Sequence, residues 1–148
     1  MSYLPDFKLE TYFSRWEFNA KYNLCASDTE SLSFKSLFEL ADDTDKNLLE
    51  DITFGYTETY GSDRLREAIA STYATASLND ILTFAGAEEG IFVAMKSILN
   101  VKDHAIVITP NYQSAQTIPA SICEVTPVNL DPKNNWDLDL TKIKNSVK

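Results

Sequence analysis

Apolar side chains recur along the chain with two different spacings, and these spacings predict its helices and strands. Six segments have the three- or four-residue spacing of an amphipathic helix: 31–40, 45–52, 62–76, 87–99, 111–122 and 139–147. Three short apolar segments are predicted as strands: 81–84, 105–109 and 123–130. A further short helix is expected near 12–17, inside an aromatic-rich arm that we expect to pack onto another part of the protein.

From residue 80 onwards the predicted strands and helices alternate, with short connections between them. This order is typical of an α/β protein with a parallel sheet. The segment 105–109 is apolar throughout, so we expect a strand that is buried on both faces. Pro127 lies inside the third predicted strand and favours an edge or irregular position, because proline donates no hydrogen bond to a sheet.

Composition limits the classes of partner. The chain has 148 residues, of which 44% are hydrophobic and 24% are charged, which is ordinary for a globular domain. Its formal net charge of −9 argues against partners that need basic patches, so we expect no nucleic acid and no membrane surface. A single small anion held by backbone N–H groups remains compatible with this charge.

Cysteine and histidine usage narrows the chemistry further. Two cysteines are too few for a disulfide framework and fit a reducing, cytoplasmic compartment. The single histidine leaves no metal-ligand spacing, so no metal site is predicted. The first ten residues carry charges where a signal peptide needs an apolar segment, and no apolar segment is long enough to span a membrane.

The most informative local feature is the junction around Gly86, where a predicted strand turns tightly into a predicted helix. The first N–H groups of a helix have no partner within it and can hold a phosphate, which a glycine lets approach closely. Tyr112 follows the next predicted strand, and ligands of such sheets bind at the carboxyl ends of strands. Either feature alone is more often an ordinary turn or a core aromatic. Together they suggest a phosphorylated aromatic cofactor.

Four collinear segments resemble class I and II pyridoxal-phosphate-dependent aminotransferases of fold type I. They are 55–70 with its Leu-Arg-Glu-Ala-Ile run, the phosphate turn 81–92, the Pro-Asn-Tyr element in 103–114, and 136–140. The segment 7–28 is similar to a subgroup related to capreomycidine synthase, from which no substrate follows. The sequence departs from the family at Lys102, where a glycine is usual, and at Pro119, which suggests a kinked helix.

The resemblance implies a role for each site residue. Backbone N–H groups of Gly86, Ala87 and Glu88 would bind the phosphate of pyridoxal 5'-phosphate, with the Glu88 carboxylate facing away. Tyr112 would stack on the pyridine ring. Tyr56 would reach the phosphate of the neighbouring subunit's cofactor, which implies a homodimer with shared sites.

The resemblance also implies a division of the chain and an incomplete site. Residues 1–45 would be an N-terminal arm and helix, and 46–148 the N-terminal part of the cofactor-binding large domain with its first βαβαβ. The Schiff-base lysine, the acidic partner of the pyridine nitrogen and the substrate-binding arginine would lie downstream. No lysine of the chain lies in the family's Ser-x-x-Lys context, so no catalytic residue is assigned. Arg66 is expected to be structural, on the surface of its helix.

These expectations favour a truncated aminotransferase, inactive alone, whose intact parent exchanges amino groups between an amino acid and a 2-oxo acid. Three alternatives stay open. The parent could instead be a lyase or cyclase on the same scaffold. The chain could be a degenerate, non-catalytic module that self-associates. A nucleotide-binding α/β domain is the third, although the sequence contains neither Gly-x-Gly-x-x-Gly nor a Walker lysine.

Overall fold

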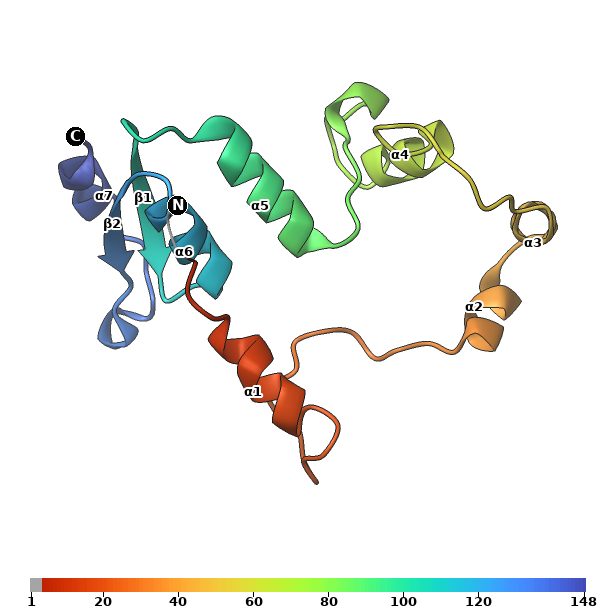
Figure 1. Ribbon diagram of the computed structural model, residues 1–148, viewed down its shortest axis with the longest axis horizontal. Helices are drawn as coiled ribbons and strands as arrows, with labels where there is room; N and C mark the ends of the chain where they lie inside the picture. The colour runs from red at the N-terminus through yellow and green to blue at the C-terminus, as the bar shows by residue number, and fades with distance from the viewer. Residues whose placement is uncertain (1–3) are drawn as a thin grey trace. The chain divides into compact units, whose positions relative to one another are not determined.

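The computed structural model describes residues 4–148, which form two compact units. The first, which we call the sheet unit, joins the residues before Ala20 to Thr83–Lys148, and the second, the helical unit, is Ala20–Leu82 (Figure 1). The expected division of the chain into residues 1–45 and 46–148 stays a prediction. None of the helices in the described part of the chain is long and apolar enough to cross a membrane.

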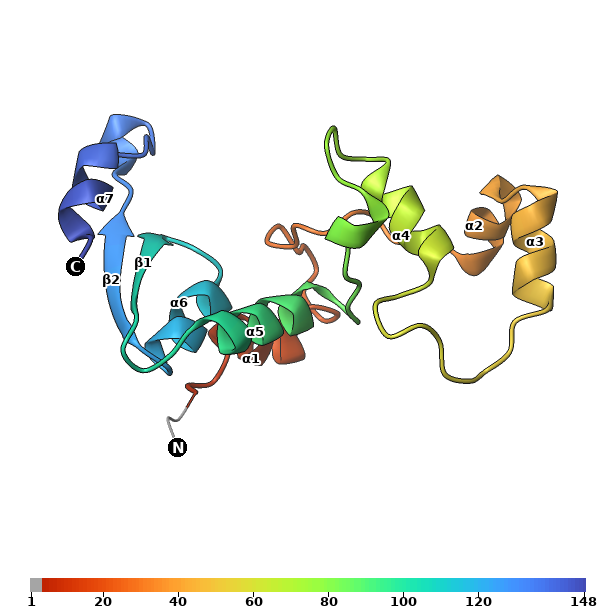
Figure 2. The same ribbon diagram turned by 90° about the horizontal axis from the view of Figure 1, so that it is seen from above.

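The sheet unit is built on two parallel strands, β1 (His104–Thr109) and β2 (Glu124–Asn129). They pair in register from His104 opposite Glu124 to Thr109 opposite Asn129. The helix α6 (Gln113–Ala120) connects them, as a parallel pair requires a crossover. It contacts both strands, whereas α7 (Leu140–Ser146) contacts β2 on the other side (Figures 1 and 2). The predicted α/β class with a parallel sheet is confirmed, and so is the predicted position of both strands to within one residue.

The core of the sheet unit is small. Val107 of β1, Val128 of β2 and Ile118 of α6 are its buried apolar residues, together with Pro119 of the same helix. The helix α5 (Ala87–Ile98) packs against α6, and its bounds match the predicted helix 87–99. Val107 is the only residue of β1 that is buried, with 7% of it exposed, although the sequence of the strand predicts burial on both faces. The only strand that pairs with β1 in the described part of the chain is β2.

One predicted strand is wrong. Residues 78–80 form a short 3-10 helix, η1 (Leu78–Asp80), and no strand follows at 81–84. The backbone of Ile81 is extended, with φ −111° and ψ 129°. A strand, however, exists only when a neighbouring strand accepts its hydrogen bonds, and no described strand pairs with this segment. The expected βαβαβ is therefore present as β1-α6-β2.

The helical unit contains α2 (Phe34–Leu40), α3 (Asp43–Glu50) and α4 (Asp63–Ala70). Ser62 caps α4 as predicted, by accepting the Leu65 N–H. The helix ends at Ala70 rather than continuing to residue 76. The hydroxyls of Ser71 and Thr72 donate to carbonyls of the preceding turn, at 2.7 and 2.8 Å, and such contacts compete with helix propagation.

Two other helix starts differ from the predictions. Ser33 rather than Ser31 caps α2, because the Ser33 hydroxyl accepts the Ser36 N–H at 3.0 Å. The aromatic arm of the sheet unit forms α1 (Lys8–Trp16), which begins four residues before the predicted helix 12–17. This earlier start depends on a distant residue, Gln113, described below.

Candidate functional site

The start of α5 has the geometry of an open anion site. Gly86 precedes the helix with φ 110° and ψ 155°, a backbone conformation that is essentially restricted to glycine. No side chain caps the helix, and its first N–H groups, from Ala87 to Glu89, have no acceptor inside it. A Cβ placed on Gly86 would meet no atom within 4 Å. The glycine is therefore required by the backbone angle, and the space in front of the turn is open.

Two carboxylates lie in the first turn of α5 and behave differently. The Glu89 carboxylate accepts the Ala85 N–H at 2.7 Å, so it folds back over the turn. The Glu88 side chain makes no such contact with the turn. Both negative charges are favourable at the positive end of the helix dipole. An anion bound by the backbone N–H groups would therefore have to tolerate the Glu88 charge nearby.

Tyr112 lies at the carboxyl end of β1, directly before α6. Its backbone N–H donates to Asn111 Oδ1 at 2.7 Å, and 44% of the residue is exposed. Burial raises the pKa of the Tyr112 hydroxyl, and the charges of Glu88 and Glu10 raise it further. The Gly86–Glu88 turn and Tyr112 therefore belong to the same compact unit, and the Glu88 charge contributes to the raised pKa of the tyrosine.

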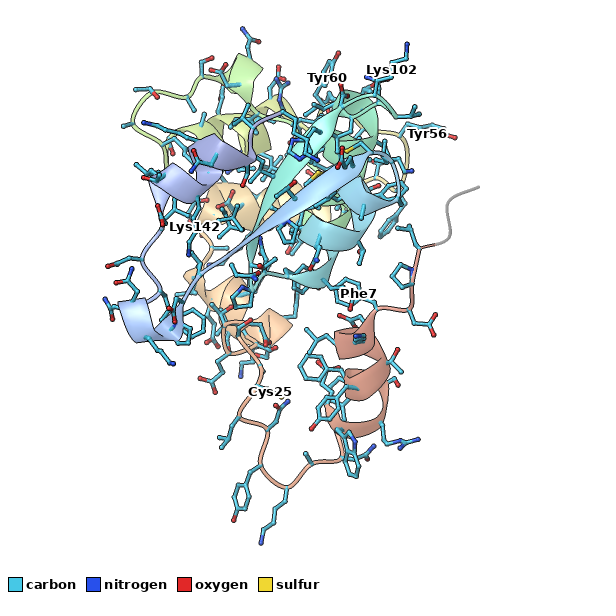
Figure 3. The ribbon with its side chains drawn as sticks, turned by 90° about the vertical axis from the view of Figure 1, so that its left-hand side faces the viewer. Phe7, Cys25, Tyr56, Tyr60, Lys102 and Lys142 are labelled. Carbon is cyan, nitrogen blue, oxygen red and sulfur yellow. The ribbon has the colours of Figure 1, made fainter. Side chains whose placement is uncertain are left out.

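The aromatic arm also reaches this place. The ring of Phe7 lies 5.0 Å from the ring of Tyr112, with the two planes tilted by 52°. Figure 3 shows Phe7 at the start of α1. The sequence predicts an arm that packs onto another part of the protein, but it assigns no role to Phe7 or to Gln113. No local signal could have identified Gln113, because its partners lie more than 100 positions away.

Tyr56 belongs to the helical unit and is fully exposed in the loop before α4. The turn and Tyr112 belong to the other unit, and the predicted role of Tyr56 stays a prediction. In the same unit Arg66 is only 8% exposed, so the expectation of a surface arginine is wrong. Its guanidinium donates to the Leu78 and Ile81 carbonyls and lies over the ring of Tyr60. Arg66 therefore has a structural role, as predicted, but it is buried within the helical unit rather than lying on its surface.

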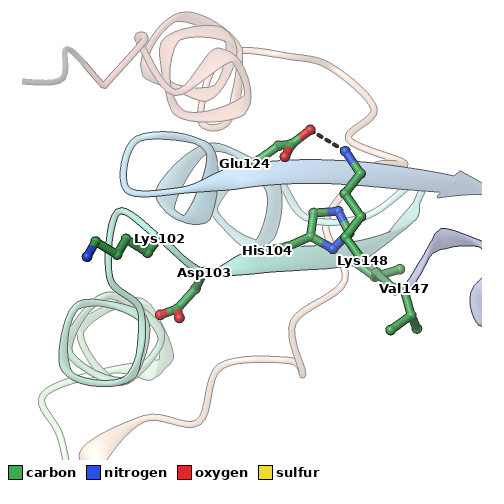
Figure 4. A pocket seen from close by; sticks show the side chains of 7 residues that line it. Lys102, Asp103, His104, Glu124, Val147 and Lys148 are labelled. Atoms are coloured by element: carbon green, nitrogen blue, oxygen red, sulfur yellow. Dashed lines mark hydrogen bonds and ion pairs between the residues drawn. The ribbon is translucent and has the colours of Figure 1, made fainter.

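A second set of charged side chains lies at the amino ends of the strands, away from Tyr112. Figure 4 shows the Glu124–Lys148 ion pair beside His104, whose Nε2 lies 2.7 Å from Thr126 Oγ1. The hydrogen bond from Lys148 and its positive charge lower the pKa of the Glu124 carboxyl. Among the residues that the structure describes, no three His, Cys, Asp or Glu side chains are grouped so that they could hold a metal ion.

A parallel βαβ unit with a glycine turn and an aromatic at the carboxyl end of a strand is typical of α/β proteins that bind ligands at this edge of the sheet. Residues 19–148 match the family described as "Aminotransferase class I and II". The chain belongs to this family, whose members depend on pyridoxal phosphate.

Individual relatives agree with this assignment. The chain is 26% identical to capreomycidine synthase of Streptomyces vinaceus over 147 residues, which are 95% of the chain and 37% of that protein. It is 28% identical over 110 residues to an aspartate aminotransferase of Sulfurisphaera tokodaii, which are 69% of the chain and 27% of that protein. The crystal structure of a PLP-dependent aminotransferase from Streptococcus suis superposes with a TM-score of 0.88 at 26% identity. The match covers 98% of this chain and 40% of that structure, so the chain spans between about a quarter and two fifths of the length of these relatives.

Proposed function

We propose that this chain supplies the phosphate turn and the ring-stacking residue of a pyridoxal-phosphate site. The proposed activity of the whole protein is amino-group transfer between an amino acid and a 2-oxo acid. The observation that carries the proposal is that one compact unit contains both the uncapped start of α5 behind Gly86 and the half-exposed ring of Tyr112. Pyridoxal phosphate, when bound, supplies the electron sink that this class of reaction needs.

The residues present fit the phosphate of such a cofactor. The N–H groups of Ala87 and Glu88 are oriented by the helix and have no acceptor inside it, so they can donate to phosphate oxygens. Gly86 holds the backbone angle that leaves this approach open. The Glu88 carboxylate is the unfavourable element, because a negative charge beside a phosphate dianion is repelled. Glu88 therefore contributes its backbone amide, and its side chain faces away from the anion.

Tyr112 would hold the flat pyridine ring over the turn by stacking. Its raised pKa keeps the hydroxyl protonated through the neutral range, so the ring adds no negative charge to the site. Tyr56, exposed in the helical unit, would reach the cofactor phosphate of a second subunit. The functional protein would accordingly be a homodimer with shared sites, located in the cytoplasm. Sedimentation of the whole protein and cell fractionation check these two points.

The chain by itself is not expected to transaminate. Its lysines lie outside the family's Ser-x-x-Lys context, so none is assigned to the Schiff base. Incubation with pyridoxal phosphate, borohydride reduction and peptide mapping test this directly. We expect scattered, low-level labelling. A single lysine labelled stoichiometrically would contradict the assignment.

Binding of 4'-deoxypyridoxine 5'-phosphate tests the site itself, since this analogue keeps the phosphate and the ring but has no aldehyde that could react with surface lysines. We expect Tyr112→Ala to weaken binding because the stacking ring is lost. We expect Glu88→Gln to strengthen it roughly threefold, because a repulsive charge is removed while the amide is kept. Glu67→Gln, an equal change of charge on an exposed position of α4, serves as the control. Weaker binding by Glu88→Gln would contradict the proposed use of its amide.

A further inference from the structure

The first residues of α1 are fastened to the start of α6 by one side chain. The Gln113 Oε1 accepts the Lys8 N–H at 3.0 Å, and the Gln113 Nε2 donates to the Asp6 carbonyl at 2.9 Å. Lys8 is the first residue of α1, and no side chain of its own segment caps that helix. Its N–H would therefore lack an acceptor without Gln113. A single carboxamide thus fixes the backbone on both sides of Phe7.

Phe7 is held in place from the helix side as well. Its carbonyl accepts both the N–H and the hydroxyl of Thr11, each at 3.0 Å. With its backbone fixed on both sides, the Phe7 ring lies against Tyr112 at 5.0 Å, the distance of a favourable tilted aromatic pair. Gln113 directly follows Tyr112 in the chain, so its hydrogen bonds and the contact between the Phe7 and Tyr112 rings both connect Phe7 to the start of α6.

The contact leaves Tyr112 usable. With 44% of the residue exposed, Phe7 restrains the ring without covering it, so a flat ligand can still reach it. A tyrosine at the start of a helix, next to open space, would otherwise change rotamer freely. Restraining a ring before a ligand arrives reduces the ordering cost of binding.

We propose that Phe7, held by the Gln113 carboxamide, is a positioning residue that sets the Tyr112 ring for stacking, and that the start of α1 forms one wall of the cofactor site. This inference rests on the proposed function. It adds two residues to the site, neither of which contacts the phosphate turn.

The fastening is tested first, without any ligand, by hydrogen exchange of the Lys8 amide in the full chain. Gln113→Leu removes both hydrogen bonds, and we expect exchange to accelerate at least fivefold, since each bond shifts an equilibrium several-fold. The matched control is Gln116→Leu, an exposed glutamine on the same helix. Unchanged exchange in Gln113→Leu would overturn the proposed fastening.

Binding of 4'-deoxypyridoxine 5'-phosphate is then compared between variants. We expect Phe7→Ala and Gln113→Leu to weaken binding by about twofold to tenfold, the range of one aromatic pair. Phe7→Tyr, which keeps the ring contact, should restore it. The near-UV circular dichroism of the bound analogue should weaken in Phe7→Ala and recover in Phe7→Tyr, which a merely structural role would not produce. Phe18→Ala, at an exposed phenylalanine of the same unit, is the control.

Different results would overturn the positioning role of Phe7 and the proposed function. If the unaltered chain binds the analogue and Phe7→Ala binds it equally well, this inference is overturned while the proposed function stands. If the unaltered chain does not bind it, the proposed function is contradicted, and the inference with it.

Discussion

Arg66, the buried arginine of the helical unit, is predicted to stabilise α4. Its Nε donates to the Ile81 carbonyl at 3.0 Å and its Nη2 to the Leu78 carbonyl at 2.7 Å. These two bonds join α4 to η1 and to the segment that leads toward the Gly86 turn. The ion pair between Arg66 and Asp63 contributes less to stability, because the Asp63 side chain is 71% exposed and solvent screens the two charges.

Replacing Arg66 by methionine keeps an apolar stem and removes both bonds. A hydrogen bond from a charged donor contributes about 1.5–3 kcal/mol, and the lower value applies here because Leu78 and Ile81 are only half-buried. We therefore expect a loss of about 3 kcal/mol in the opening free energy of α4, which corresponds to roughly 100-fold faster exchange of its amides. Arg66→Lys keeps the charge but can reach one carbonyl, so about half of this loss is expected.

Hydrogen exchange followed by mass spectrometry over 62–82 measures this effect locally, which matters because both tryptophans lie in the sheet unit. The matched control is Arg64→Met, two positions away on the same helix. Arg64 pairs with Asp45, but the two side chains are 57% and 47% exposed, so a change below about 1 kcal/mol is expected. If Arg66→Met exchanges within threefold of the unaltered chain, or no faster than Arg64→Met, the structural role assigned to Arg66 is refuted.

Three further predictions concern single groups. Hydrogen bonds from the Ser77 hydroxyl and backbone N–H lower the pKa of Asp80, so Ser77→Ala should raise this pKa in a carboxyl NMR titration. The stability that Asp80 contributes is present above its ordinary pKa and should be lost as the pH falls through its lowered pKa. Burial and the charges of Glu88 and Glu10 raise the pKa of Tyr112, so Glu88→Gln should lower this pKa part of the way toward its ordinary value in a ¹³C-tyrosine NMR titration. The stability linked to Tyr112 should be present below its ordinary pKa and lost as the pH rises through its raised pKa. Gly86→Ala should cost about 1–3 kcal/mol in urea denaturation because of its positive φ, whereas Gly55→Ala, at a glycine without a positive φ, should be close to neutral.

The sequence predicted those elements whose formation depends on neighbours in the chain. The apolar spacing after Gly86 predicted α5 to within one residue, and the apolar segment before Tyr112 predicted β1. The predicted bounds of helices were wrong where hydrogen bonds between side chains and the backbone decide where a helix begins or ends. Back-bonding by Ser71 and Thr72 ends α4 early. The cap of α2 is Ser33 rather than the predicted Ser31, because the Ser33 side chain accepts the Ser36 N–H.

The same distinction applies to the candidate site. Gly86 and Tyr112 could be paired from the sequence, because the carboxyl ends of parallel strands meet at one edge of a sheet. Phe7 could not be added to them. Its position depends on Gln113, which is separated by more than 100 residues from the backbone groups it binds, and no spacing rule applies to such a contact.

The incomplete burial of β1 likewise depends on contacts with other segments and not on the sequence of the strand alone. Its sequence, His-Ala-Ile-Val-Ile-Thr, is that of a strand with cover on both faces, yet only Val107 is buried and only β2 pairs with it among the described strands. The segment 81–84 likewise has a strand-like sequence, but none of the described strands pairs with it. The chain covers 40% of the length of the Streptococcus suis structure that it resembles. The turn at Gly86 belongs to α5, and the ring of Tyr112 lies at the start of α6 against Phe7, so neither position depends on a further strand beside β1. The proposed binding of a phosphorylated ring and the stability of the sheet can therefore be measured separately, and a weakly stable sheet would not by itself argue against the proposed site.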